Sequence, residues 1–120
     1  MKLPDQSFQI EKYLHRPDYI RQTGEQVAKD FGMAGEEITL PSDDEKAYDQ
    51  LSEQIQHILQ RLMNENMERL QFLLYRVDLN EKYVFQEAVN NGHVNLFTQV
   101  ADMILRRELM KVIIRNNLKY

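Results

Sequence analysis

Apolar residues recur every three or four positions along most of the chain, which is the spacing of one face of an α-helix. The longest such series runs from Tyr48 to Val77 and contains no glycine or proline. Because nothing in this series is a strong helix breaker, the pattern predicts one continuous helix over about residues 43–77. At 1.5 Å per residue such a helix is about 50 Å long.

A second long helix is predicted over about residues 94–116, where apolar side chains point to nearly every side. A helix that is apolar on most sides is buried on most sides, or lies between its own core and a partner. Residues 110–114, MKVII, are also compatible with a strand, because a short apolar run does not distinguish the two. The helical pattern that precedes this run favours the helix.

Turn and capping residues predict the remaining helices. One or two N-terminal helices are expected, over about 5–15 and 18–31, with Pro17 next to the first turn of the second. A short helix over about 81–90 follows Asn80, a good N-cap residue. The predicted fold class is therefore all-α: an elongated bundle of two long helices, a short connecting helix and the N-terminal helices.

Four further residues mark expected helix ends. Ser42 and Glu45 have the spacing of a capping box, in which each side chain bonds a backbone N–H of the other, so the long helix is expected to begin there. Gly32 and Gly92 stand where left-handed caps would end the second and the short helix.

Gly24 lies on the same predicted helical face as the apolar Ile20, Val27 and Phe31. Glycine in a helix costs about 1 kcal/mol relative to alanine. Two interpretations are open: a helix position without a special role, or a site where another segment approaches closely.

Composition supports a globular chain of one domain, residues 1–120. Hydrophobic residues make up 42% and charged residues 28% of the chain, as in ordinary globular proteins. Cysteine is absent, which excludes disulfides and thiolate metal sites. The sequence has no signal-peptide core and no apolar run long enough to span a membrane, so a cytoplasmic location is expected.

Charge is distributed unevenly along the chain. Residues 1–60 contain 12 acidic and 6 basic side chains, whereas residues 61–120 contain 7 acidic and 9 basic ones. The two halves are therefore expected to attract each other, within one chain or between two. Basic residues gather near the C-terminus, at Arg106, Arg107, Lys111, Arg115 and Lys119. Asp102 and Arg106 have the favourable spacing of four for an ion pair.

Few residues suggest chemistry. Glu53 and His57 are four apart, but a di-iron bundle uses Glu-x-x-His on two helices with further carboxylates. His57 is therefore expected on the surface, and His15 and His93 in turns. Because no catalytic motif occurs, the sequence predicts no enzyme, no cofactor and no metal site.

The apolar surface of the two long helices exceeds what the N-terminal helices could cover, which predicts a homodimer. The candidate interface residues are Asn66, Leu70, Leu74, Leu105, Arg107, Leu109 and Ile113. Asn66 falls on the apolar face, where an amide needs a partner and can fix helix register. Arg107 or a symmetry-related Asn66 is the predicted partner.

The leading hypothesis for function is thus a non-catalytic protein–protein interaction or structural protein that acts as a homodimer. The first alternative is an adaptor that binds another protein or a nucleic acid through its basic and apolar C-terminal helix, although a pI of 5.4 argues against nucleic acid. The second alternative is a metal-dependent or metal-free enzyme.

The segment LLYRVDLNEKYV, followed by ADMILRRELMKVIIRNN, resembles the C-terminal part of a family of small, uncharacterised helical bacterial proteins. The resemblance covers about residues 70–116 and is a packing pattern without known activity, ligand or functional residue. It implies a bacterial, cytoplasmic origin and a helix, turn, short helix and helix that pack as one piece.

Overall fold

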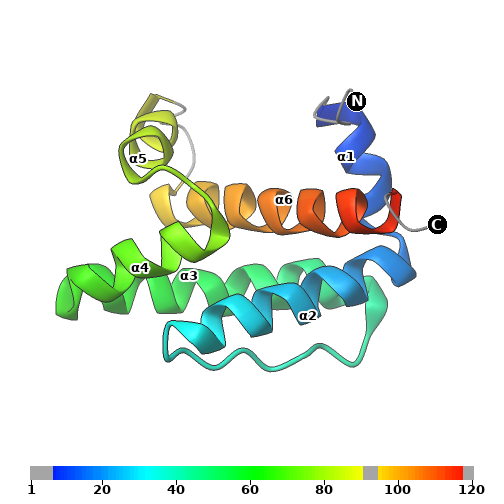
Figure 1. The fold of residues 1–120 in the computed structure, drawn as a ribbon, viewed down its shortest axis with the longest axis horizontal. Coiled ribbons are helices and arrows are strands. Elements are labelled where there is room, and N and C mark those ends of the chain that lie inside the picture. The colour runs from blue at the N-terminus through cyan, green and yellow to red at the C-terminus, as the bar shows by residue number, and fades with distance from the viewer. Residues whose placement is uncertain (1–6, 91–94, 118–120) are drawn as a thin grey trace.

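The computed structural model describes residues 7–90 and 95–117, and every element within them is helical, which confirms the all-α class (Figure 1). The elements in chain order are α1 (Ser7–Leu14), α2 (Pro17–Met33), the 3₁₀ turn η1 (Asp44–Lys46), α3 (Ala47–Glu65), α4 (Met67–Val77), α5 (Glu81–Asn90) and α6 (Leu96–Asn117). Described helices have no span long and apolar enough to cross a membrane.

Helix α6 is the centre of the bundle. It packs against each of the five other α-helices, most extensively α2 and α3. Its buried side chains lie on several sides of the helix, from Val100 to Ile113. The prediction that this segment is helical and buried on most sides is confirmed, and residues 110–114 are not a strand.

The predicted continuous helix over residues 43–77 is wrong, because the chain breaks at Asn66. This residue has φ −156° and ψ 84°, which is not a helical conformation. Its side-chain oxygen accepts a hydrogen bond from the Arg69 N–H at 3.1 Å, so Asn66 caps the N-terminus of α4. The break lets α4 turn back toward α2 and α6, and the molecule measures 42 × 30 × 25 Å, less than the length of the predicted helix.

Two predicted helix ends differ in detail. The capping role falls to Asp43, whose carboxylate accepts from the Glu45 N–H at 3.0 Å, and not to Ser42. The following turn is 3₁₀, so the α-helix itself begins only at Ala47. At the end of α2, Gly35 and not Gly32 has the positive φ of +81°. Gly92 lies outside the described residues.

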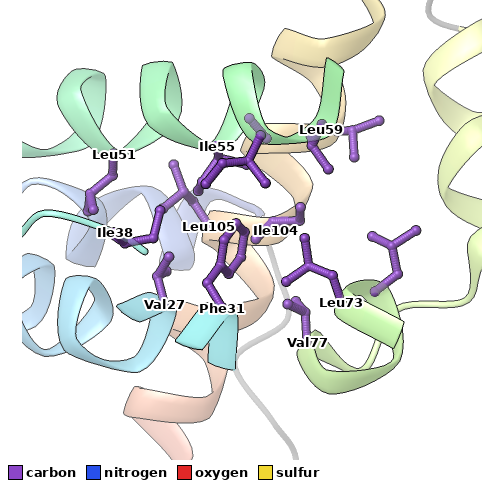
Figure 2. Packing of buried hydrophobic residues seen from close by; sticks show 14 of the residues in the cluster. Val27, Phe31, Ile38, Leu51, Ile55, Leu59, Leu73, Val77, Ile104 and Leu105 are labelled. Carbon is purple, nitrogen blue, oxygen red and sulfur yellow. The ribbon is translucent and has the colours of Figure 1, made fainter. Parts of the chain in front are cut away.

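The main core joins α2, α3, α4 and α6. Figure 2 shows the Phe31 ring among Val27 of the same helix, Leu105 and Ile104 of α6, and side chains of α3 and α4. Ile38, from the segment between α2 and η1, also enters this core. A smaller cluster joins α1 to the C-terminal half of α6 through Ile10, Leu14, Leu109, Met110 and Ile113.

Gly24 marks a close approach of ordinary tightness. A Cβ atom added there would lie 3.5 Å from a Leu40 methyl and 3.6 Å from a Leu51 methyl. These are normal van der Waals distances, so α2 and α3 pack closely here but leave room for a methyl group.

Candidate functional site

The apolar interface candidates lie inside the chain's own core. At most 1% of the surface of each of these side chains is exposed: Leu70, Leu74, Leu105, Leu109 and Ile113. Two features of the fold bury them, namely the return of α4 after Asn66 and the central position of α6. They form no exposed surface, which corrects their assignment to an interface.

The two polar candidates have partners other than those predicted. Asn66 is exposed and caps its own helix. Arg107 forms an ion pair with Asp78. Asp78 ends α4 in the left-handed conformation, with φ 71°. The predicted pairing of Asn66 with Arg107 is therefore wrong.

Glu53 and His57 are both exposed on α3. Within residues 7–90 and 95–117, no three or more metal-ligating side chains lie together as a metal ion would require. His57 borders a surface hollow of about 380 Å³ with the segment Thr39–Ser42. Gln54 also lines the hollow. Its amide accepts a hydrogen bond from the Thr39 N–H and donates one to the Thr39 carbonyl, so it holds this segment against α3. His93 lies outside the described residues.

The most unusual polar feature is a buried cluster between α2, α4 and α6. Asp30 is 2% exposed and Glu108 is 0% exposed. The Lys111 ammonium lies 2.8 Å from Asp30 Oδ2 and 3.1 Å from Glu108 Oε1. It also donates to the Arg76 carbonyl at the end of α4, at 2.9 Å. This one ammonium group therefore connects all three helices.

Further contacts complete the cluster around Asp30. Gln26 donates to Asp30 Oδ2 at 3.2 Å, and the Arg76 guanidinium lies 3.7 Å from Oδ1. Neither oxygen of Glu108 has a hydrogen-bond donor of suitable geometry among the described residues. Asp30 is thus well satisfied as an anion, whereas Glu108 is not.

The two carboxyl groups consequently differ in proton affinity. Burial, and secondly the neighbouring Asp30, raise the pKa of Glu108 to about 9. Burial alone would also raise the pKa of Asp30, but hydrogen bonds from Glu108, Lys111 and Gln26 hold it below its ordinary value. At neutral pH Glu108 is therefore a neutral acid beside an ionised Asp30.

A second cluster fixes the break between α3 and α4. Glu36 is 5% exposed and lies three residues after the end of α2. Arg61 of α3 pairs with one of its oxygens, and Arg69 of α4 pairs with the other at 3.1 Å. One buried carboxylate thus binds the helices on both sides of Asn66.

A third cluster joins α1, α3 and α6. Asp102 accepts hydrogen bonds from the Tyr48 hydroxyl and from Arg106 Nε, the latter at 2.8 Å. Arg106 also pairs with Glu11 of α1. Burial, together with the Asp102 carboxylate, raises the pKa of Tyr48, so its phenol stays protonated and donates. The predicted pair of Asp102 with Arg106 is confirmed.

These clusters occupy the basic side chains of α6. Arg106, Arg107 and Lys111 have the carboxylate partners given above, and Arg115 donates to Gln26 at 2.9 Å. Five ion pairs among the described residues join a basic residue after position 60 to an acidic residue before position 60. The charged halves of the chain therefore complement each other within the fold, and a nucleic acid would have to compete with these pairs. Lys119 lies outside the described residues.

Helices α4 and α5 lie at the end of the molecule opposite α1 (Figure 1), and they carry four of the exposed large apolar side chains. Tyr75 is 75% exposed and Phe72 is 45% exposed, one turn apart on α4, and Tyr83 lies on the adjoining α5. Met67 begins α4, and the Met33 sulfur contacts Arg76 of α4. Phe72, Tyr75 and Tyr83 are here called the α4–α5 face. With Met33, Met67 and Leu40 they are the six large apolar residues exposed in the described parts of the chain.

Sequence reasoning missed both the α4–α5 face and the buried acid. Phe72 and Tyr75 look like part of the apolar pattern of a long helix, and only the break at Asn66 sets which side of α4 is covered. Glu108 did carry a signal, since it stands between Leu105, Leu109 and Val112 on a helix that is apolar on most sides.

The chain was compared with protein-family models, with curated protein sequences and with solved structures, and none of them matches.

Proposed function

We propose that this chain is a non-catalytic interaction protein that docks through its α4–α5 face, and that a second copy of the chain is the partner. The observation that carries the proposal is the concentration of exposed aromatic and methionine side chains on one short helix and its two neighbours. Aromatic residues and methionine are enriched in protein interfaces relative to the remaining surface. Tyrosine in particular combines a large apolar area with a hydroxyl that bonds to a partner.

The three polar clusters support a structural role for the polar residues away from the α4–α5 face. Each of the three clusters links different helices of the fold, through Lys111, Glu36 and Asp102. Their acids and bases are engaged with one another rather than directed into a common cleft. The exposed α4–α5 face is the surface that this internal bonding leaves without an assigned role.

A second copy is the simplest occupant because a twofold axis brings the same face of each chain together. Such an interface needs one self-complementary patch, and most soluble oligomers are built this way. The proposed dimer differs from the one expected from the pattern of apolar residues, since it uses exposed residues of α4 and α5 and not the buried leucines.

Sedimentation velocity over a range of protein concentrations tests the proposal. Wild-type protein is expected to shift from monomer to dimer, and the double variant Phe72→Ser, Tyr75→Ser is expected to remain monomeric. Leu40→Ser is the matched control, because Leu40 is 50% exposed but lies between α2 and η1. A wild-type protein that stays monomeric at tens of micromolar would refute self-association. Equal dimerisation of all three proteins would show that another surface is used.

The resemblance to small bacterial helical proteins remains a proposal of the same kind. It is consistent with the packing of α4, α5 and α6 against one another. Affinity capture with the wild-type chain and with the double variant, in parallel, would show whether a different protein binds the α4–α5 face instead.

A further inference from the structure

The cluster of Asp30, Glu108 and Lys111 has a property that the proposed docking function does not use. The Lys111 ammonium lies 2.8 Å from Asp30 Oδ2 and 3.1 Å from Glu108 Oε1, so two buried carboxyl groups share one site in the contact between α2 and α6. These helices run antiparallel, since Gln22 pairs with Asn116 at one level and Asp30 with Lys111 further along. The contact is the most extensive helix pair in the fold.

We propose that α2 and α6 are locked together by one proton shared between Glu108 and Asp30, and that loss of this proton at alkaline pH loosens the α2–α6 contact. Glu108 is fully buried. Both oxygens of Glu108 are inaccessible to water and have no N–H or O–H donor of suitable geometry within the described chain. An ionised carboxylate in such a place would lose its hydration without full replacement.

A proton on Glu108 resolves this deficit. The neutral acid needs far less solvation, and its O–H can donate to the Asp30 carboxylate. Asp30 already accepts from Lys111 and Gln26, so the added bond joins α6 directly to a fixed anion of α2. Two carboxyl groups that share a site hold one proton strongly, because both cannot ionise without repulsion.

Charged groups on the neighbouring helices set the electrostatic environment of the Glu108 proton. Asp30 faces Glu108 from α2, and Lys111 faces it from the next turn of α6. Arg76 of α4 reaches Asp30 on the side of Oδ1. Glu11 of α1 pairs with Arg106, and the Tyr48 hydroxyl of α3 donates to Asp102, so neither of them faces Glu108. No described charged side chain of α5 forms an ion pair with α6.

Removal of the proton changes this balance. With Glu108 ionised, Lys111 must serve two carboxylates as well as the Arg76 carbonyl. The hydrogen bond from Glu108 to Asp30 is replaced by repulsion between anions. Opening of the contact would let water hydrate both carboxylates. Ionisation of Glu108 therefore favours separation of α2 from α6.

The sign of the pH effect follows from linkage. The folded chain keeps the Glu108 proton to higher pH than the unfolded chain, in which the pKa is ordinary. The stabilisation is therefore complete below the unfolded pKa and is lost as pH rises toward the folded one. Between about pH 5 and pH 9 the ratio of folded to unfolded protein should fall by about tenfold per pH unit from this group alone.

Urea unfolding at a series of pH values tests the proposal on the full chain. Other groups titrate in this range, so the informative quantity is the difference between wild type and Glu108→Gln, which retains an amide N–H that can bond Asp30. The unfolding constant of wild type should rise by about tenfold per pH unit relative to the variant. Glu53→Gln, at an exposed acid on α3, is the control and should follow wild type. Parallel profiles for wild type and Glu108→Gln would overturn the proposal.

Two measurements on wild type keep the test decisive if the variant does not fold. Infrared spectra of protein with carbonyl-labelled glutamate should show a protonated carboxylic acid at pH 7. Hydrogen exchange, corrected for the intrinsic rate, should accelerate in α2 and α6 more than in α3 as pH rises toward 9. A spectrum without protonated acid at pH 7, or equal acceleration in all helices, would contradict the shared proton or the local loosening, respectively.

Discussion

Replacement of Asn66 by alanine tests whether residues 47–77 form two helices or one. The two arrangements predict stability changes of opposite sign. Asn66 is exposed, so no burial term enters, and its side chain makes one hydrogen bond, to the Arg69 N–H. If α3 and α4 are separate helices, alanine removes the N-cap of α4 and destabilises the protein by about 1 kcal/mol. If residues 47–77 formed one helix, alanine would improve helix propensity and stabilise it by about 0.5 kcal/mol.

Thermal and urea unfolding followed by circular dichroism measure this change. The cap loss corresponds to a lower Tm by about 4 °C for a chain of this size. Asn64→Ala is the matched control, because Asn64 is exposed within the last turn of α3 and should be neutral or slightly stabilising. Asn66→Asp preserves an acceptor and should retain most of the stability. A stabilised Asn66→Ala variant, or one that matches Asn64→Ala, would refute the break as described.

Two further variants test the packing of the helices. Gly24→Ala should stabilise the protein by up to about 1 kcal/mol, as measured by urea unfolding, because the added methyl meets Leu40 and Leu51 at ordinary contact distances. A loss of stability would mean that α2 and α3 approach each other more closely than described. Arg61→Ala combined with Arg69→Ala should cost about 3 kcal/mol, because both cations on the buried Glu36 carboxylate are removed, and a cost no larger than that of either single variant would contradict joint binding.

The fold class and several helix positions could be predicted because they depend on local information. Pro17, Asn80 and the apolar spacing place α2, α5 and α6 within a few residues of their observed bounds. Asn80 caps α5 as expected, since its side chain accepts from the Tyr83 N–H at 3.1 Å. The central burial of α6 likewise follows from a helix that is apolar on most sides.

The break at Asn66 could not be predicted because a capping asparagine and an interior asparagine look the same in a sequence. The apolar spacing continues across it, since Leu62 and Leu70 both enter the core of the same chain. Once the break was missed, the buried leucines looked uncovered and the exposed side of α4 was not recognised. Burial depends on how helices fold back on one another, which local periodicity does not contain.

NMR spectra of labelled wild-type protein at increasing concentration test the proposed self-association through the α4–α5 face most directly. We expect concentration-dependent chemical-shift changes in residues 67–83, centred on Phe72 and Tyr75. The backbone around Leu40, the exposed apolar residue away from this face, should not shift. Spectra that do not change with concentration, or changes centred on Leu40, would contradict the proposal.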